Sequence, residues 1–160
     1  MLFQIPEGAF LIDGYAPHVG AAAAVTGDYI SLKNAQMAWV IFQYRQADGN
    51  AITFQVNKAT AVAPTGATVI TNVVPIWSNL DTATSDTLVR RTDAATYAAG
   101  TGATNKVVIF QIDPASLGST YDCIAGYASA VAAGQYVSML YVVVPKFASA
   151  VAEQATFITD

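Results

Sequence analysis

The chain has 160 residues, of which 54% are hydrophobic and only 11% are charged, with a formal net charge of −4. A chain of this length buries enough surface to fold as one domain without a disulfide or a metal. Average soluble proteins carry about 25% charged residues, so charge protects little of this surface. The composition favours a protein that buries much of its surface against neighbours.

Simple counts argue against several classes of protein. A membrane-spanning helix needs about 20 consecutive apolar residues, and the longest apolar runs, 37–42 and 137–144, are only long enough for strands. A nucleic-acid surface needs clustered basic residues, whereas only Arg90 and Arg91 are adjacent. The single cysteine, Cys123, permits no internal disulfide, and the amino terminus lacks the basic and long apolar segments of a secretory signal.

The amino-terminal segment is rich in small residues, with four consecutive alanines at 21–24. It shows little periodicity apart from a short strand candidate at 8–12. Small residues without periodicity gain order by lying on a neighbour, so we expect residues 1–28 to form an extended arm. The β core is then expected over residues 29–147, followed by a carboxyl-terminal tail over residues 148–160.

The next segment carries the clearest strand signals. Residues 37–44 are apolar almost throughout, as in a strand that is covered on both faces. Residues 52–57 alternate apolar and polar side chains, as in a half-exposed strand. Between them, Asp48 and Gly49 can adopt the positive φ angles of a tight turn. We therefore predict a β-hairpin, which Gly49→Val would destabilise.

Further strands are predicted along the rest of the chain. Short apolar or β-branched runs bounded by turn residues occur at 29–32, 68–74, 86–92, 107–112, 121–128 and 135–144. The charged run at 86–92 suits an edge strand, and the last two runs predict a second hairpin. Short helices are expected only at 94–99 and 149–154. The spacing predicts an all-β fold, an antiparallel β-sandwich or barrel-like domain of about seven to nine strands.

Groups that could perform catalysis are few and scattered. His18 is the only histidine, and Cys123 lies among apolar residues, which favours a structural role. The polar region with Asp81, Asp86 and Asp93 could attract calcium, but it lacks the sequence of a calcium-binding loop. A distant pair of carboxylates, as in glycosidases, stays open. We expect no catalytic residue, no cofactor and no metal, in a protein that is not an enzyme.

Three stretches resemble a known family. They are "ISLKNAQMAWVIFQYRQADGNAITFQVNKATAVAPTGA", "NKVVIFQIDPASLG" and "YDCIAGYASAVAAGQYVSMLYVVVPKF", in this order. Together they resemble the small head proteins of tailed bacteriophages that act as capsid decoration (cement) proteins. The resemblance covers about three quarters of the chain and rests on structural rather than catalytic motifs. It departs from the expected pattern at 144–146, where an arginine commonly follows the last strand.

The resemblance implies a virion structural protein on the exterior of an icosahedral capsid, made in the host cytoplasm. Its partners would be the major capsid protein and other copies of itself, as a homotrimer, with no nucleic acid and no membrane. The small-residue segments 17–27 and 92–105 are the expected contact regions. The candidate interface residues are Pro17, His18, Val19, Val25, Thr92 and Thr101.

Two alternative functions are compatible with the same residues. A head–tail connector or a tail component would also be a charge-poor β-protein of the virion. A carbohydrate-binding β-sandwich module would use exposed aromatic side chains, for which the candidates are Trp39, Phe42, Tyr44 and Phe54.

Overall fold

The computed structural model describes residues 8–20, 22–47, 49–147 and 157–158. This part of the chain forms twelve strands and one short 3-10 helix, η1 (Pro114–Leu117). The strands are β1 (Phe10–Val19), β2 (Ala23–Thr26), β3 (Ile30–Ser31), β4 (Ala35–Arg45), β5 (Thr53–Ala59), β6 (Thr68–Val69), β7 (Ile76–Asn79), β8 (Val89–Arg90), β9 (Thr96–Ala98), β10 (Asn105–Ile112), β11 (Cys123–Val131) and β12 (Tyr136–Pro145). The predicted all-β fold is confirmed, with more strands than expected.

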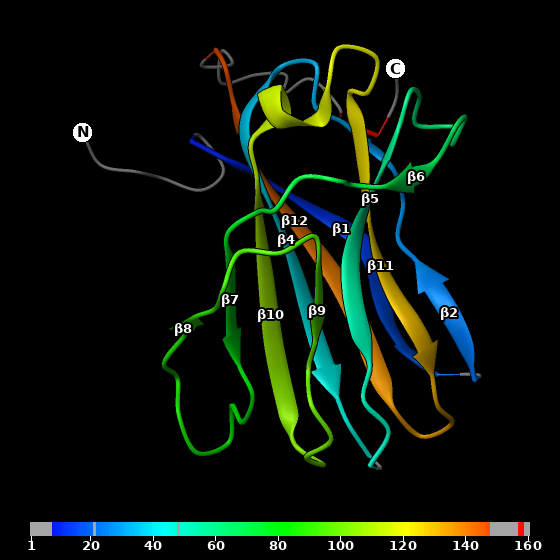
Figure 1. The fold of residues 1–160 in the computed structure, drawn as a ribbon, viewed down its shortest axis with the longest axis vertical. Helices are drawn as coiled ribbons and strands as arrows, with labels where there is room; N and C mark the ends of the chain where they lie inside the picture. The colour runs from blue at the N-terminus through cyan, green and yellow to red at the C-terminus, as the bar shows by residue number, and fades with distance from the viewer. Residues whose placement is uncertain (1–7, 21, 48, 148–156, 159–160) are drawn as a thin grey trace.

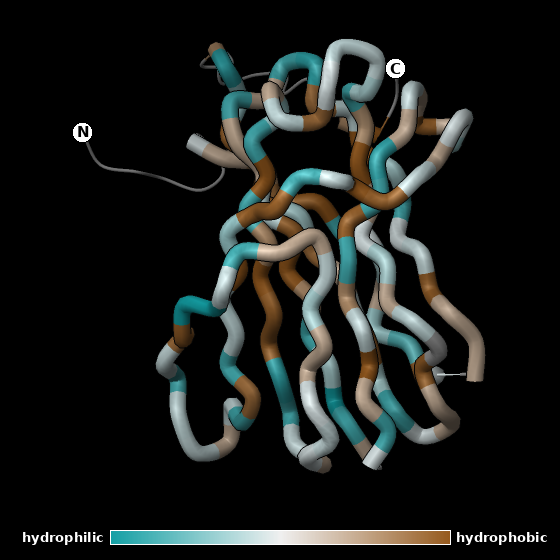
Figure 2. Tube along the Cα trace, in the orientation of Figure 1, coloured by the Kyte–Doolittle hydropathy of each residue, from teal (hydrophilic) through white to brown (hydrophobic). Residues whose placement is uncertain are grey.

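The strands form two antiparallel sheets that pack face to face as a sandwich (Figure 1). Sheet A has the order β1-β12-β4-β10-β7-β8, so the short charged strand predicted within residues 86–92 does lie at a sheet edge. Sheet B has the order β2-β11-β5-β6, with β3 also paired to β11 and β9 to β5. Figure 2 shows apolar residues recurring along the strands and small or polar residues in most loops.

One large cluster of buried side chains fills the space between the sheets. Its centre is aromatic: the ring of Phe42 lies 4.8 Å from that of Phe54 and 5.8 Å from that of Phe110. Phe42 and Phe110 come from sheet A, and Phe54 comes from sheet B. The cluster therefore joins both layers of the sandwich, and burial of its apolar surface is the main stabilising contribution.

Neither predicted hairpin forms, although the strands themselves are present. β4 pairs with β10 and β12 in sheet A, while β5 pairs with β6, β9 and β11 in sheet B. β11 and β12 are likewise consecutive but lie in opposite sheets. Asp48 lies outside the described residues. Gly49 has no positive φ angle and no neighbouring atom within 4 Å of an added Cβ, so the predicted cost of Gly49→Val is wrong.

The predicted amino-terminal arm is wrong where β1 and β2 form. β1 pairs along its length with β12 at one edge of sheet A, and β2 pairs with β11 at one edge of sheet B. The pairing of β1 has two register shifts, between Asp13 and Tyr15 and between Tyr15 and His18. Because each shift changes the face on which the following side chains lie, the sequence shows no regular period. The β core thus begins at Phe10, not at residue 29.

The described end of the carboxyl-terminal segment packs on the sandwich. Phe157 is buried, its ring lies 4.7 Å from that of Phe10, and its carbonyl oxygen accepts a hydrogen bond from the Ser31 N–H at 2.6 Å. The predicted helix at 149–154 lies outside the described residues. The helix predicted at 94–99 is wrong, because this segment contains strand β9.

Tyr141 of β12 connects the two sheets. Its side chain is fully buried, and its hydroxyl donates a hydrogen bond to the Asp28 carbonyl oxygen at 2.9 Å. The same hydroxyl accepts a hydrogen bond from the Gly126 N–H of β11 at 3.0 Å. Gly14 and Gly27 also lie against this side chain, where an added Cβ would collide with it. One tyrosine thus satisfies two backbone groups and fills the space that the glycines leave.

Raising the pH above about 10 is expected to destabilise the fold through Tyr141. Burial raises the pKa of this phenol well above its ordinary value near 10, and burial raises the pKa of Tyr29 as well. The unfolded chain therefore loses these protons at a lower pH than the folded chain does. The free energy of unfolding falls as the pH rises, by at most about 1.4 kcal/mol per pH unit for one group.

Urea unfolding midpoints measured from about pH 8 to about pH 11 test this expectation. The wild-type midpoint should fall steeply above about pH 10. Tyr141→Phe should start lower, because two backbone groups lose their partner, but its midpoint should fall less steeply. Equal slopes in the two proteins would contradict the role given to Tyr141.

Candidate interaction surfaces

The residues predicted to form an interface lie at several places in the fold. Pro17, His18 and Val19 end β1 and are exposed, and the His18 ring lies edge-on to Tyr15 with centroids 6.1 Å apart. Val25 lies half-buried in β2. Thr92 and Thr101 are exposed in loops, Thr92 after β8 and Thr101 before β10.

Part of this set meets at one end of sheet A. Val19 pairs with Tyr136 of β12, which pairs with Arg45 of β4, which pairs with Asn105 of β10. Thr101 lies in the loop that leads into Asn105. Val25 pairs instead with Ala128 in sheet B, and Thr92 lies beyond the opposite edge of sheet A. The structure therefore groups Pro17–Val19 with the β9–β10 loop and leaves Val25 and Thr92 apart.

A pocket of about 380 Å³ lies at this end of sheet A. The Arg45 guanidinium lies 5.9 Å from the centroid of the Tyr136 ring, within cation–π range. Pro17, Gln43 and Asn105 also line the pocket. An aromatic ring beside a guanidinium and two amides could bind a polar, uncharged ligand through stacking and hydrogen bonds.

Lys106 lies beside the same pocket and is almost fully buried, with 3% of its surface exposed. Its ammonium donates hydrogen bonds to Oε1 of Gln46 and to the carbonyl oxygens of Ala99 at 2.9 Å and Gly100 at 3.4 Å. Burial lowers the pKa of this ammonium. The lysine ties the start of the β4–β5 connection to the β9–β10 loop, which fixes the shape of this end of the sandwich.

The outer face of sheet A is the most unusual surface of the described chain. Side chains that alternate with the core residues of β4, β10 and β12 point away from sheet B, yet they are mostly apolar. Successive partners across the sheet make one continuous row: Asp13, Leu140, Ile41, Ile109, Trp77 and Arg90. The four apolar members between the two charges are only partly exposed.

Further apolar side chains flank this row on the same face. Trp39 lies opposite Val142, and Met37 lies opposite Val144. By contrast, the outer face of β5 in sheet B carries Thr53, Gln55 and Asn57, the polar pattern that is usual for an antiparallel sheet facing water. We call the outward-facing residues of β1, β12, β4, β10, β7 and β8 the sheet A face.

The sequence carried a signal for this surface. Residues 37–44 are apolar almost throughout, which predicted a strand covered on both faces. In the described structure sheet B covers one face of β4, and the described strands form no third sheet over the other. Most of the aromatic residues proposed to bind sugars are not on the surface. Phe42, Tyr44 and Phe54 are core residues, and of the four only Trp39 lies on the sheet A face.

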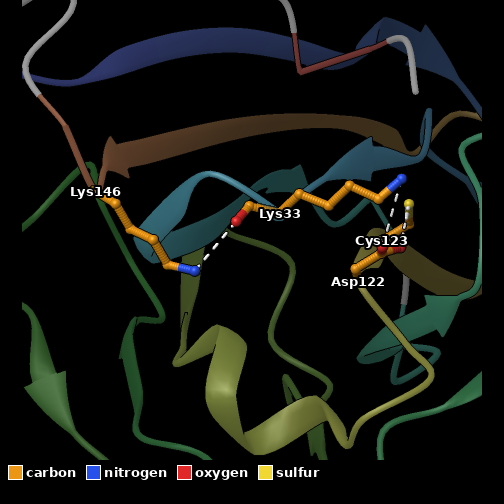
Figure 3. Close-up of polar contacts among 4 residues, drawn as sticks. All are labelled: Lys33, Asp122, Cys123 and Lys146. Carbon is orange, nitrogen blue, oxygen red and sulfur yellow. Dashed lines mark hydrogen bonds and ion pairs between the residues drawn. The ribbon is translucent and has the colours of Figure 1, made fainter.

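Cys123 is part of a small polar cluster at the other end of the sandwich (Figure 3). Its buried thiol donates a hydrogen bond to Oδ1 of Asp122 at 3.3 Å. The Lys33 ammonium lies 3.6 Å from the other Asp122 oxygen, and Lys146 donates to the Lys33 carbonyl oxygen at 3.1 Å. These contacts tie the start of β11 and the end of β12 to the β3–β4 turn. They favour a structural role for the cysteine.

Two of the three aspartates considered for calcium, Asp81 and Asp93, have other contacts. Asp93 forms an ion pair with Arg90, and Oδ1 of Asp81 accepts a hydrogen bond from the Ala83 N–H at 3.2 Å. Among the residues that the structure describes, no three His, Cys, Asp or Glu side chains gather closely enough to hold a metal ion. No helix of the described chain is long and apolar enough to cross a membrane.

Comparison with known proteins gives a likeness of fold only. No protein-family model and no curated protein matches the sequence. The SPBc2 prophage-derived protein YomS is similar in structure, with 12% identity and a TM-score of 0.48 over 90% of this chain and 98% of that one. The Tobacco streak virus coat protein has 10% identity and a TM-score of 0.37, with 96% of both chains covered. A protein described as a CBM4 has 11% identity and a TM-score of 0.35, covering 88% of this chain and 81% of that one.

Proposed function

We propose that this chain is a virion structural protein, a capsid decoration (cement) protein that binds the outer surface of an icosahedral phage head and stabilises it. Its partners are the major capsid protein and other copies of itself, with a homotrimer as the expected state. In this role the protein performs no catalysis. It contributes a stable fold and adhesive surfaces.

The observation that carries the proposal is the combination of scarce charge with exposed apolar side chains. The chain has only seven basic and eleven acidic residues. Large apolar side chains are nevertheless exposed at its edges and ends, among them Val19, Val73, Leu88, Val89, Tyr136 and Phe147. Such a surface is typical of proteins that act by binding other proteins, because interface centres are poor in charge and rich in apolar and aromatic groups.

Binding to heads that lack the protein tests the proposal. Purified protein is mixed with such heads, and the bound fraction is measured by sedimentation and located by electron cryomicroscopy. We expect regular density on the outside of the shell, at positions of local three-fold symmetry if the bound form is a trimer. Density confined to one vertex or to the tail would favour a connector or tail component instead. Heads that bind nothing would overturn the proposal.

The pocket beside Tyr136 supports a carbohydrate-binding module as the second candidate function. The ring of Tyr136 and the side chains of Gln43, Arg45 and Asn105 are of the kinds that stack on sugar rings and bind their hydroxyl groups. Glycan-array binding that Tyr136→Ala abolishes and Tyr127→Ala, a substitution in sheet B, leaves unchanged would establish this candidate. Absence of glycan binding would remove it.

A further inference from the structure

We propose that the sheet A face binds the same face of a second copy of this chain, across a two-fold axis that runs parallel to the strands. The pair would form a four-layered stack of sheets with the two sheet A layers at its centre. This inference concerns the free protein and does not depend on attachment to a capsid.

The sheet A face is built like the inside of a sandwich. Ile41, Ile109 and Leu140 meet side by side across three neighbouring strands, with Trp77 next in the row. Both tryptophans of the chain, Trp39 and Trp77, belong to this face. Stacked sheets lie about 10 Å apart with their inner side chains interdigitated, and a wide apolar face suits such packing.

The charges at the two edges of the sheet A face are complementary. Asp13 ends the apolar row on β1, and Arg90 ends it on β8, at opposite edges of the sheet. A two-fold axis parallel to the strands turns the sheet over and exchanges its edges, so β1 of one copy faces β8 of the other. Asp13 then meets Arg90 of the partner subunit, and the symmetry makes this pair twice. The apolar residues between them meet one another.

The local contacts of Arg90 leave it suited to this role. Its guanidinium lies 4.8 Å from the centroid of the Trp77 ring, forms an ion pair with Asp93, and donates hydrogen bonds from Nη1 to the carbonyl oxygens of Ile76 and Arg91. These contacts hold the side chain over the end of the row, and both charged groups of the ion pair stay partly exposed. A guanidinium offers five donors, so Nε and Nη2 still have donors for a second carboxylate beside Asp93.

The size of the face is also sufficient. The four long strands and the shorter β7 and β8, at about 4.8 Å spacing, give a footprint of roughly 500 Å² per copy. A pair would bury about 1,000 Å² in total, which reaches the lower limit for a specific interface. Such a pair is compatible with a trimer formed through the loops, since the two contacts generate a six-copy assembly with D3 symmetry when their axes cross at right angles.

Sedimentation equilibrium of the whole chain with substitutions on the face tests the inference. Ile41→Glu places two unpaired carboxylates in the centre of the contact. Because burying an unpaired charge is strongly unfavourable, we expect the dissociation constant of the pair to rise at least about a hundredfold. The mass of the assembly should fall by half. Gln55→Glu, at a partly exposed position on the outer face of sheet B, is the matched control and should leave the mass unchanged.

Charge reversal provides a second test that does not touch the apolar residues. Asp13→Arg and Arg90→Asp should each weaken the pair roughly tenfold, because each places like charges opposite one another twice. The double variant should recover most of the affinity. Tryptophan fluorescence follows the same equilibrium, since both tryptophans become more exposed when the pair dissociates.

Two results would overturn the inference. One is an assembly mass that Ile41→Glu leaves unchanged. The wild-type chain would then be a trimer, or a monomer, as expected if another segment or a glycan covered the face. The other is a double charge reversal that associates no better than the single variants. Neither result bears on whether the protein binds phage heads, so failure here is distinguishable from failure of the proposed function.

Discussion

Replacing Phe42 by alanine is expected to lower the free energy of unfolding by about 3–5 kcal/mol, the range for large aromatic residues in well-packed cores. Phe42 is fully buried, and its ring contacts those of Phe54 and Phe110 from both layers of the sandwich. The backbone of Gly126 also closes on it, since an added Cβ there would lie 3.0 Å from the ring. Strands on both sides are held by their ladders, so the cavity cannot collapse easily.

Urea unfolding followed by circular dichroism measures this loss. Phe147→Ala is the matched control, because Phe147 is 76% exposed and its truncation should change stability by less than about 0.5 kcal/mol. Phe42→Leu should fall between the two, since it leaves a smaller cavity. If Phe42→Ala unfolded at the same urea concentration as Phe147→Ala, the aromatic cluster would not be the centre of the core.

The strands of the core could be predicted from the sequence because burial of one strand face makes apolar and polar residues alternate along the chain. β5 shows it directly, with buried Phe54 and Val56 alternating with the partly exposed Thr53, Gln55 and Asn57. The same alternation indicates which side chains face inward, but it does not indicate which sheet the strand joins. β4 and β5 therefore read as a hairpin, although they lie in opposite sheets. The choice between the two depends on long-range contacts that local pattern does not contain.

Only the start of β1 was predicted, as the strand candidate at 8–12, because the rest of its pattern is broken by its own geometry. Phe10 and Ile12 face the core with regular spacing, but the register shifts around Tyr15 interrupt the alternation. The segment also contains Gly14, Ala16 and Pro17, which are poor strand formers by propensity. Pairing with the long strand β12 outweighs that propensity. Removal of residues 1–27 would take away two strands of the sandwich rather than a loose arm.

The candidate interface was only half predictable for a related reason. Low charge and small residues predict contacts with neighbours and place them in the loops. The continuous apolar run of β4 indicated two covered faces, and the structure shows that the chain itself supplies one cover. Which residues lie together on the second face depends on the lateral order of the strands. That order places Asp13 and Arg90 at opposite ends of one row, which no sequence spacing reveals.

Replacing Gly14 by alanine is expected to cost at least about 3 kcal/mol, although it adds a single methyl group. An added Cβ would overlap the ring carbons Cε2 and Cζ of Tyr141 and lie 2.8 Å from its hydroxyl oxygen. The ring is fully buried and its hydroxyl is fixed by hydrogen bonds to Asp28 and Gly126. Relief of the overlap would therefore displace the ring, break both hydrogen bonds and leave two backbone groups without a partner. Overpacking and the lost hydrogen bonds add in the same direction.

Two comparisons separate this effect from a general intolerance of alanine for glycine. Gly102→Ala is the matched control, because the nearest atom to its added Cβ is Oγ1 of Thr104 at 4.0 Å, and it should leave the urea midpoint unchanged. In a Tyr141→Leu background, which is itself destabilised, Gly14→Ala should cost much less, because the ring that it meets is gone. The difference between the two costs measures the coupling of the residues and should exceed about 1 kcal/mol. Equal costs in both backgrounds would show that glycine is required at position 14 for its backbone conformation rather than for the close approach of Tyr141. The connection between the two sheets would then have to be sought elsewhere.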